Sequence, residues 1–307
     1  MNTKFKINLN ISFVFFLLTL ILGFLEFYNH LSKDFLSVVA CLFLILTIGV
    51  SHGALDDLKG YKLLKFYKIN NKLLFFAAYI LFVSLIIIFW LLMPTLMLVL
   101  FLIVASYHFG KEDCWGIKLK KTNFYILIFF LKGSLIISAP LLFSFNETLK
   151  IFDTLGIKDS GFFNLLNIIN NNLFLLSFVI ISIISNLLIV RSLGELTRLF
   201  IDTICILILY SSFNPLIAFT IYFCFLHSIR HSASLITELE INLNSFIKKA
   251  LPLTIITAFF FLIGLYVLTG FQSIDVESSI IAVIFIGLAS LTFPHILLEY
   301  LLEKNEK

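Results

Sequence analysis

Long apolar segments recur along almost the whole chain, and they constrain its fold more than any other feature. A helix needs about 20 apolar residues to cross the hydrocarbon core of a bilayer. These segments are too long for strands and lack the alternation typical of an outer-membrane barrel. We therefore expect an all-α, polytopic transmembrane helical bundle of about eight to ten spans. The segments lie at roughly 11–29, 35–52, 73–92, 95–109, 123–145, 172–190, 199–213, 215–230, 250–270 and 280–301.

Composition excludes a soluble domain. The chain is 60% hydrophobic and 13% charged, with a mean hydropathy of +1.07, and a soluble protein of this length could not bury so much apolar surface. We expect residues 1–307 to form one integral-membrane domain without a nucleic-acid partner. Pro94 and Pro215 separate short apolar segments and predict tight turns or helix breaks. No signal peptide is evident, so the first span is expected to be retained.

The distribution of basic residues predicts the orientation. Of 22 Lys and Arg residues, only Lys33, Lys150 and Lys158 fall outside and Lys132 falls within a span when the N-terminus is cytoplasmic, which leaves eighteen on the cytoplasmic side. This distribution follows the positive-inside rule. Both termini are then cytoplasmic, and the protein is a multi-pass protein of the inner (cytoplasmic) membrane.

Five of the six histidines lie near one end of an apolar segment, and the predicted topology puts all five on the cytoplasmic side. Imidazole is the commonest protein ligand for transition metals, and ionisable residues inside a membrane usually mark function. Two of these histidines share a helix face at positions i and i+4, and two more would complete a four-nitrogen metal site. The five are His52, His108, His227, His231 and His295, whereas His30 is expected at the opposite side.

Acidic residues follow two of the histidines closely. A metal-bound imidazole usually donates its other N–H to a carboxylate or carbonyl, although these residues could also be loop charges that balance the lysines. Tyr107 and Tyr222 could point hydroxyl groups at the site or be ordinary interfacial aromatics. Gly53 and Gly110 allow a turn or a close backbone approach. The acidic residues are Asp56 and Asp57 after His52, and Glu112 and Asp113 after His108.

The four cysteines show no CxxC spacing, so we interpret Cys41, Cys114, Cys205 and Cys224 as core residues rather than a zinc or disulfide framework. Three other functions fit histidines in a membrane. A di-iron desaturase or hydroxylase needs about eight histidines, and a bis-histidine haem b electron carrier needs two facing pairs. A transporter would use midplane charges, for which Asp202 and Lys132 are the candidates.

Four motifs resemble those of the bacterial and archaeal Brp/Blh-type β-carotene dioxygenases. They are SHGALDD at 51–57, YHFGKED at 107–113, HSIRH at 227–231 and FPH at 293–295, in the order of the family. The resemblance implies oxidative cleavage of the central double bond of β-carotene by O₂, giving two molecules of all-trans-retinal. It also implies a non-haem Fe(II) cofactor, and it suggests a microbial rhodopsin as a partner that receives the retinal directly.

By the same resemblance, the iron ligands are His52, His108, His227 and His231. His295 is assigned to the second shell or the substrate pocket, together with Asp56, Asp113, Tyr107 and Tyr222. A tunnel lined by Phe and Leu could hold the polyene by contact area alone. Cleavage at the centre requires that half of the rod extend past the iron.

Overall fold

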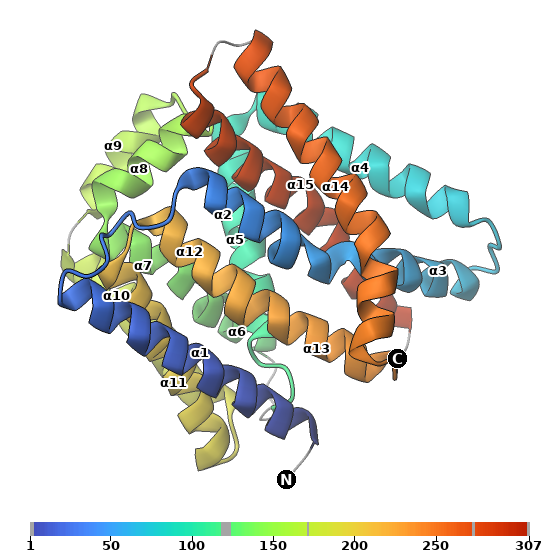
Figure 1. Cartoon of the computed structure of the whole chain (residues 1–307), viewed down its shortest axis with the longest axis horizontal. Helices are drawn as coiled ribbons and strands as arrows, with labels where there is room; N and C mark the ends of the chain where they lie inside the picture. The colour runs from blue at the N-terminus through green and yellow to red at the C-terminus, as the bar shows by residue number, and fades with distance from the viewer. Residues whose placement is uncertain (1–2, 118–123, 171, 272–273, 306–307) are drawn as a thin grey trace.

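The computed structural model is a bundle of helices (Figure 1). It describes residues 3–117, 124–170, 172–271 and 274–305, without the side chains of residues 51, 52, 172 and 271. The α-helices are α1 (Thr3–Phe27), α2 (Val38–Leu44), α3 (Asp56–Phe66), α4 (Lys72–Leu92), α5 (Pro94–Glu112), α6 (Tyr125–Gly133), α7 (Leu135–Phe143), α8 (Phe145–Thr154), α9 (Ser160–Ile169), α10 (Asn172–Ile189), α11 (Leu193–Ser212), α12 (Pro215–Tyr222), α13 (Ile229–Glu238), α14 (Leu243–Phe271) and α15 (Val276–Asn305). Two π-helical turns, η1 (Ile45–Gly49) and η3 (Phe223–Ser228), and one 3₁₀ turn, η2 (Val50–Leu55), connect some of them.

The expected all-helical membrane fold is confirmed. Within the described residues, seven helices are long and apolar enough to cross a membrane, or eight if the bent pair 160–169 and 173–189 counts as one span. The pair is bent by 76°. The protein is therefore a multi-pass membrane protein, with seven or eight candidate spans where about eight to ten were expected.

Two of the ten segments expected as spans do not form long apolar helices in the structure. Helix α11 begins before residue 199 and carries Glu195, Arg198 and Asp202, so it is too charged to qualify as an ordinary span. The segment 215–230 is divided by η3 into pieces that are each short. The stretch 53–72, which lies between two of the expected spans, is mostly helix α3, which continues the helix before it.

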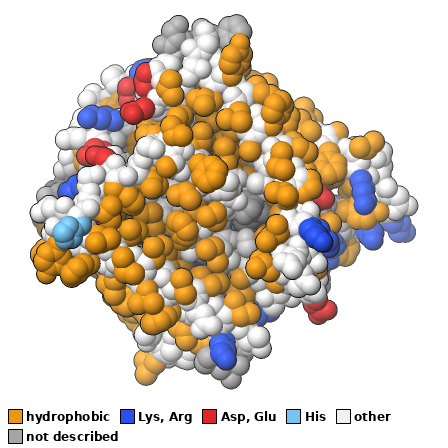
Figure 2. Space-filling model, in the orientation of Figure 1, with side chains coloured by type: hydrophobic (Ala, Val, Ile, Leu, Met, Phe, Trp, Pro, Cys, Tyr) orange, Lys and Arg blue, Asp and Glu red, His pale blue; other side chains and the backbone are white. Residues whose placement is uncertain are grey.

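Helices α4 and α14 cover the outside of the bundle. Only 11% of the 18-residue apolar stretch in each of them is buried, and apolar side chains cover most of the face in Figure 2. A continuous apolar surface of this kind is stable in lipid rather than in water. These two helices therefore present their apolar side chains to the bilayer.

The central helix of the bundle is the run from α12 through η3 to α13. Every residue of α12 is buried, and the run lies between α1 and α2 in Figure 1. Both chain termini lie at the end of the bundle reached by α13, and α8 and α9 lie at the other end (Figure 1). The four cysteines are buried and unpaired by disulfides, as expected.

Candidate metal centre

Four of the five predicted histidines meet inside the bundle. The His108 ring lies 5.2 Å from His227, 6.5 Å from His231 and 5.3 Å from His295, measured between ring centroids. The rings of His231 and His295 are 5.3 Å apart. All four residues are buried. Residues from α5, η3, α13 and α15 thus form one cluster, which we call the histidine cluster.

The side chain of His52 lies outside the described residues. Its backbone belongs to η2, which contacts both η3 and α13. The turn that carries His52 therefore lies beside the helix that carries His227 and His231. His30 is exposed in the turn after α1 and is not part of the cluster.

Two carboxylates hold two of the imidazoles from outside the cluster. Nδ1 of His231 lies 2.7 Å from Oε2 of Glu112, and Nδ1 of His295 lies 2.8 Å from Oδ1 of Asp56. An ionised carboxylate can only accept, so each Nδ1 is assigned the proton. Nε2 then carries the lone pair, the tautomer that a metal ligand requires. Oδ2 of Asp56 also accepts a hydrogen bond from Tyr79 at 3.0 Å.

Glu299 adds a carboxylate that the sequence analysis did not identify. Its Oε1 lies 3.7 Å from Nε2 of His295 and 2.8 Å from Nζ of Lys59. Candidate ligand atoms of His108, His295 and Glu299 lie within 4.8 Å of one another. The same holds for Glu112, His231 and Glu299. The signal was present in the sequence, because His295 and Glu299 are four residues apart on one helix.

Aromatic rings cover the apolar side of His227. The Phe223 ring is stacked on it at 5.6 Å with an interplanar angle of 16°, and the Phe109 ring meets it edge-on at 4.8 Å. Both phenylalanines are buried. This aromatic layer separates the histidine cluster from the apolar interior of the bundle.

The two π-helical turns pack against each other beside the cluster. The backbone carbonyl of Gly49, the last residue of η1, accepts a hydrogen bond from Ser228 of η3 at 3.1 Å. A Cβ atom on Gly49 would lie only 2.6 Å from the ring of Phe223. Glycine is therefore needed where these turns meet. The HSIRH motif is not one regular α-helix as expected, because His227 belongs to the π turn and His231 to α13.

Helices α5 and α6 approach closely beside His108. A Cβ atom on Gly110 would overlap the carbonyl of Phe129, and one on Gly133 would overlap the carbonyl of Ser106. The expected close backbone approach at Gly110 is thus observed. At Gly53 nothing lies closer than Asp56 Oδ2, 4.0 Å from the position of a Cβ.

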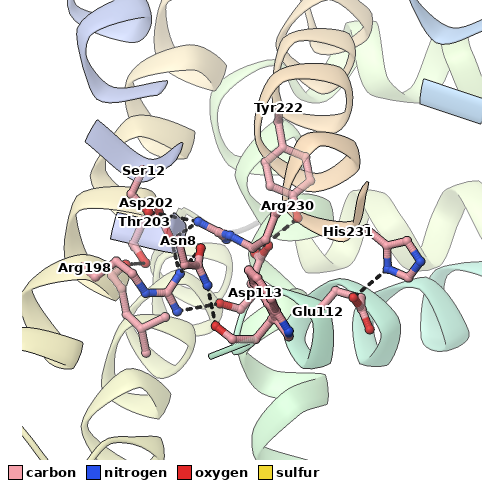
Figure 3. Close-up of polar contacts among 12 residues, drawn as sticks. Asn8, Ser12, Glu112, Asp113, Arg198, Asp202, Thr203, Tyr222, Arg230 and His231 are labelled. Carbon is pink, nitrogen blue, oxygen red and sulfur yellow. Dashed lines mark hydrogen bonds and ion pairs between the residues drawn. The ribbon is translucent and has the colours of Figure 1, made fainter. Parts of the chain in front are cut away.

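A buried network of charges adjoins the cluster (Figure 3). Arg230, between His227 and His231 in the sequence, donates to Asp113 Oδ1 at 3.1 Å and to Asp202 Oδ2 at 2.9 Å. It also donates to Ser12 Oγ at 3.0 Å. The guanidinium thereby joins α1, α11 and α13 to Asp113. Because Asp113 directly follows Glu112, these contacts also set the position of the Glu112–His231 pair.

A second arginine continues this network. Arg198 donates to Asn8 Oδ1 at 3.1 Å, to Asp202 at 3.3 Å and to the backbone carbonyl of Asp113 at 2.9 Å. Both arginines are fully buried. Paired, hydrogen-bonded charges of this kind are the only ones that a low-dielectric interior tolerates. Asp202, considered as a transport residue, is held by both arginines.

The remaining predicted residues lie around this network. Asp113 contacts Arg230 rather than a histidine, and it accepts a hydrogen bond from Tyr222 at 3.2 Å. The Tyr222 ring is 6.2 Å from the ring of His227. Tyr107 is half-buried and packs against Phe129 at 6.2 Å.

Comparison with known proteins gives one consistent result. The sequence model of the family described as beta-carotene 15,15'-dioxygenase matches residues 43–303. A beta-carotene 15,15'-dioxygenase of the uncultured marine bacterium 66A03 is 28% identical over 263 residues, 84% of this chain and 90% of that protein. No solved structure matches the chain. The matched range contains the four residues of the histidine cluster and also His52.

Proposed function

Because the chain belongs to the β-carotene 15,15'-dioxygenase family, we propose that it cleaves β-carotene at the central double bond with O₂ and releases two molecules of all-trans-retinal. The observation that carries this proposal is the buried histidine cluster with carboxylates on its outer nitrogens. Such a cluster inside an apolar bundle brings a metal-binding group to a depth where a carotenoid dissolves. The reaction consumes a substrate without polar groups, and that substrate enters from the lipid bilayer.

The donor set fits a non-haem Fe(II) ion. Imidazole nitrogens are ligands that suit iron, and we assign His52, His108, His227 and His231 as the ligands. When bound, the iron supplies the reactivity toward O₂ that amino acid side chains lack. His295 is assigned to the second shell or the substrate pocket, and its distance to His108, which nearly equals that of His227, makes it the residue to test first.

The protein's own residues orient and shield this centre. Glu112 and Asp56 accept the Nδ1 protons of His231 and His295, which fixes the ring orientations. Lys59 forms an ion pair with Glu299, so the carboxylate beside the cluster is neutralised. Phe109 and Phe223 exclude water from the side on which an apolar substrate would approach.

The proposed location is the inner (cytoplasmic) membrane of the cell, with both termini on the cytoplasmic side. It is supported by the basic residues predicted on one side and by the two termini at one end of the bundle. The retinal product is apolar and stays in the bilayer, from which a microbial rhodopsin could take it directly.

The test is expression in cells that produce β-carotene, followed by extraction of pigments and elemental analysis of the purified protein. We expect loss of the orange colour, retinal as the product, and close to one iron per chain without haem. His108→Ala, His227→Ala, His231→Ala and His52→Ala should abolish cleavage and release iron, whereas His30→Ala should match the parent.

Three results would contradict the proposal or its parts. Orange cells that contain folded protein would refute the activity. Two irons per chain or a haem spectrum would refute the mononuclear non-haem centre. If His295→Ala also loses its iron, His295 is a ligand and the set must be redrawn.

A further inference from the structure

A narrow apolar cavity runs along one face of α5. Leu98, Phe101, Leu102, Ala105 and Phe109 line it, and their spacing of three or four residues places them on one side of the helix over about three turns. From Leu98 to Phe109 the helix rises about 16 Å, at about 1.5 Å per residue. The lining therefore follows α5 over these three turns.

The inner end of the cavity reaches the histidine cluster. Phe109 lines the cavity and its ring also meets that of His227 at 4.8 Å. Phe219, another lining residue, is stacked on Phe223 at 5.4 Å, and Phe223 is stacked on His227. Only one layer of aromatic side chains separates the cavity from the imidazoles.

Helix α8 lies at the outer end of the cavity. Phe152 of α8 and Leu155, the residue just past the end of α8, line the cavity, and both side chains are buried. The backbone carbonyl of Leu155 accepts a hydrogen bond from Nε1 of Trp90 at 3.1 Å. The Trp90 ring also packs against Phe101 at 6.3 Å. These contacts fix the outer wall relative to α5.

The chemistry of the wall selects a hydrocarbon. Apart from the hydroxyl groups of Thr148 and Tyr210, its lining is aliphatic and aromatic, and the hydroxyl group of Thr148 is already used, because it donates to the carbonyl of Ser144 at 2.9 Å. A polar occupant would lose most of its hydrogen bonds to water without replacement. A hydrocarbon loses nothing and gains contact with the aromatic rings.

We infer that this cavity is a slot for one half of the carotenoid, and that the distance from the histidine cluster to its outer wall selects the central double bond. The inference rests on the proposed function. β-Carotene is a rod of roughly 30 Å, so one half needs roughly 15 Å, which the length of α5 from Leu98 to Phe109 provides at about 1.5 Å per residue. The volume of the cavity is about 80 Å³, so its flexible side chains move apart when the polyene enters.

The first experiment changes the depth of the slot. Leu155→Ala removes part of the outer wall, so the rod can slide further in and be cut off-centre into two unequal carbonyl products. We expect the ratio of unequal to equal products to rise at least about tenfold, equivalent to about 1.4 kcal/mol between two binding registers. Leu135→Ala is the matched control, because Leu135 is equally buried, at 3% exposure, but does not line the cavity.

The second experiment measures binding without catalysis. The chain has two tryptophans, so Trp115→Phe leaves Trp90 at the outer end of the slot as the single fluorophore. All-trans-retinol has the length of half a carotenoid and should quench Trp90. Adding Ala105→Leu, which fills the middle of the slot, should raise the retinol concentration that gives half-maximal quenching at least about tenfold. Ala250→Leu, a similarly buried position away from the cavity, should leave it unchanged.

The outcomes separate this inference from the proposed function. A parent enzyme that makes retinal, together with a Leu155→Ala variant that keeps the parental products and an Ala105→Leu variant that keeps the parental affinity, would overturn the slot. A parent without cleavage activity, but with retinol quenching that Ala105→Leu weakens, would refute the proposed function and leave the slot in place. Thermal unfolding of each variant shows that it is folded when measured.

Discussion

Arg230 is the residue whose removal should most destabilise the bundle beside the metal centre. Its guanidinium donates to Asp113, Asp202 and Ser12, at distances of 2.9 to 3.1 Å, and it is fully buried. Arg230→Met keeps an unbranched apolar side chain of similar length but removes the charge. Two buried carboxylates then lose a partner each.

The structure gives the expected size of this effect. Removing one member of a buried ion pair costs about 3–5 kcal/mol, because the remaining charge stays in a low dielectric. Asp202 keeps Arg198 at 3.3 Å and Asp113 keeps the hydroxyl group of Tyr222 at 3.2 Å, so we expect the lower end, about 3 kcal/mol. Asp202→Asn in the same chain should recover part of the loss, since the network then holds one arginine, Arg198, and one carboxylate, Asp113, instead of one arginine and two carboxylates.

The assay is equilibrium unfolding of the purified protein in detergent, compared with the exposed ion pair of Lys158 and Asp153. Those two side chains are 73% and 57% exposed, so Lys158→Met should cost less than about 1 kcal/mol. If the free energy of unfolding of Arg230→Met lies within about 1 kcal/mol of the parent's, the network does not stabilise the bundle. If Asp202→Asn lowers the free energy of unfolding by the same amount in the Arg230→Met variant as in the parent, the two residues do not interact.

Three further predictions concern the centre, the packing and the topology. Glu112→Gln weakens the acceptor for His231 and should lower iron affinity about 10–100-fold in a chelator competition. An unchanged affinity would show that Glu112 does not support the metal centre. Gly110→Ala forces α5 away from α6 and should cost about 1–3 kcal/mol of unfolding free energy. Gly194→Ala, with nothing within 4 Å, should cost nothing, and equal effects would contradict the packing argument. In intact cells an impermeant thiol reagent should label Lys33→Cys and not Lys62→Cys, and the reverse pattern would invert the topology.

The parts of the fold that follow from local pattern could be predicted from the sequence. Apolar segments predicted helices, and Gly110 predicted a close helix contact that the structure contains. The grouping of His108, His227, His231 and His295 followed from placing helix ends on one side of a membrane. Each of these inferences needs only the period of a helix and the thickness of a bilayer.

The partners of the charged residues could not be predicted in this way. Hydropathy treats Arg198, Asp202 and Arg230 as residues that interrupt a span, whereas in the structure they neutralise one another inside the bundle. Their pairing depends on the packing of separate helices. Hydropathy also did not distinguish the π turn at Phe223–Ser228 from a regular helix, because the two differ by one residue per turn.

That π turn makes the length of the central helix matter more than the identity of many of its residues. A π turn holds one more residue than an α turn over nearly the same rotation, so deleting one residue between Phe223 and Ser228 would give a regular α-helix with the part beyond it in nearly the same orientation. Inserting one residue there would instead rotate everything beyond by about 100° about the helix axis, because the turn already holds its extra residue. His231 would then turn away from Glu112, and Arg230 would turn away from Asp113. Substitutions and a single deletion within this segment can be absorbed locally, whereas an insertion cannot. Among related chains the number of residues here should therefore not exceed the number in this chain, even where the residue types differ.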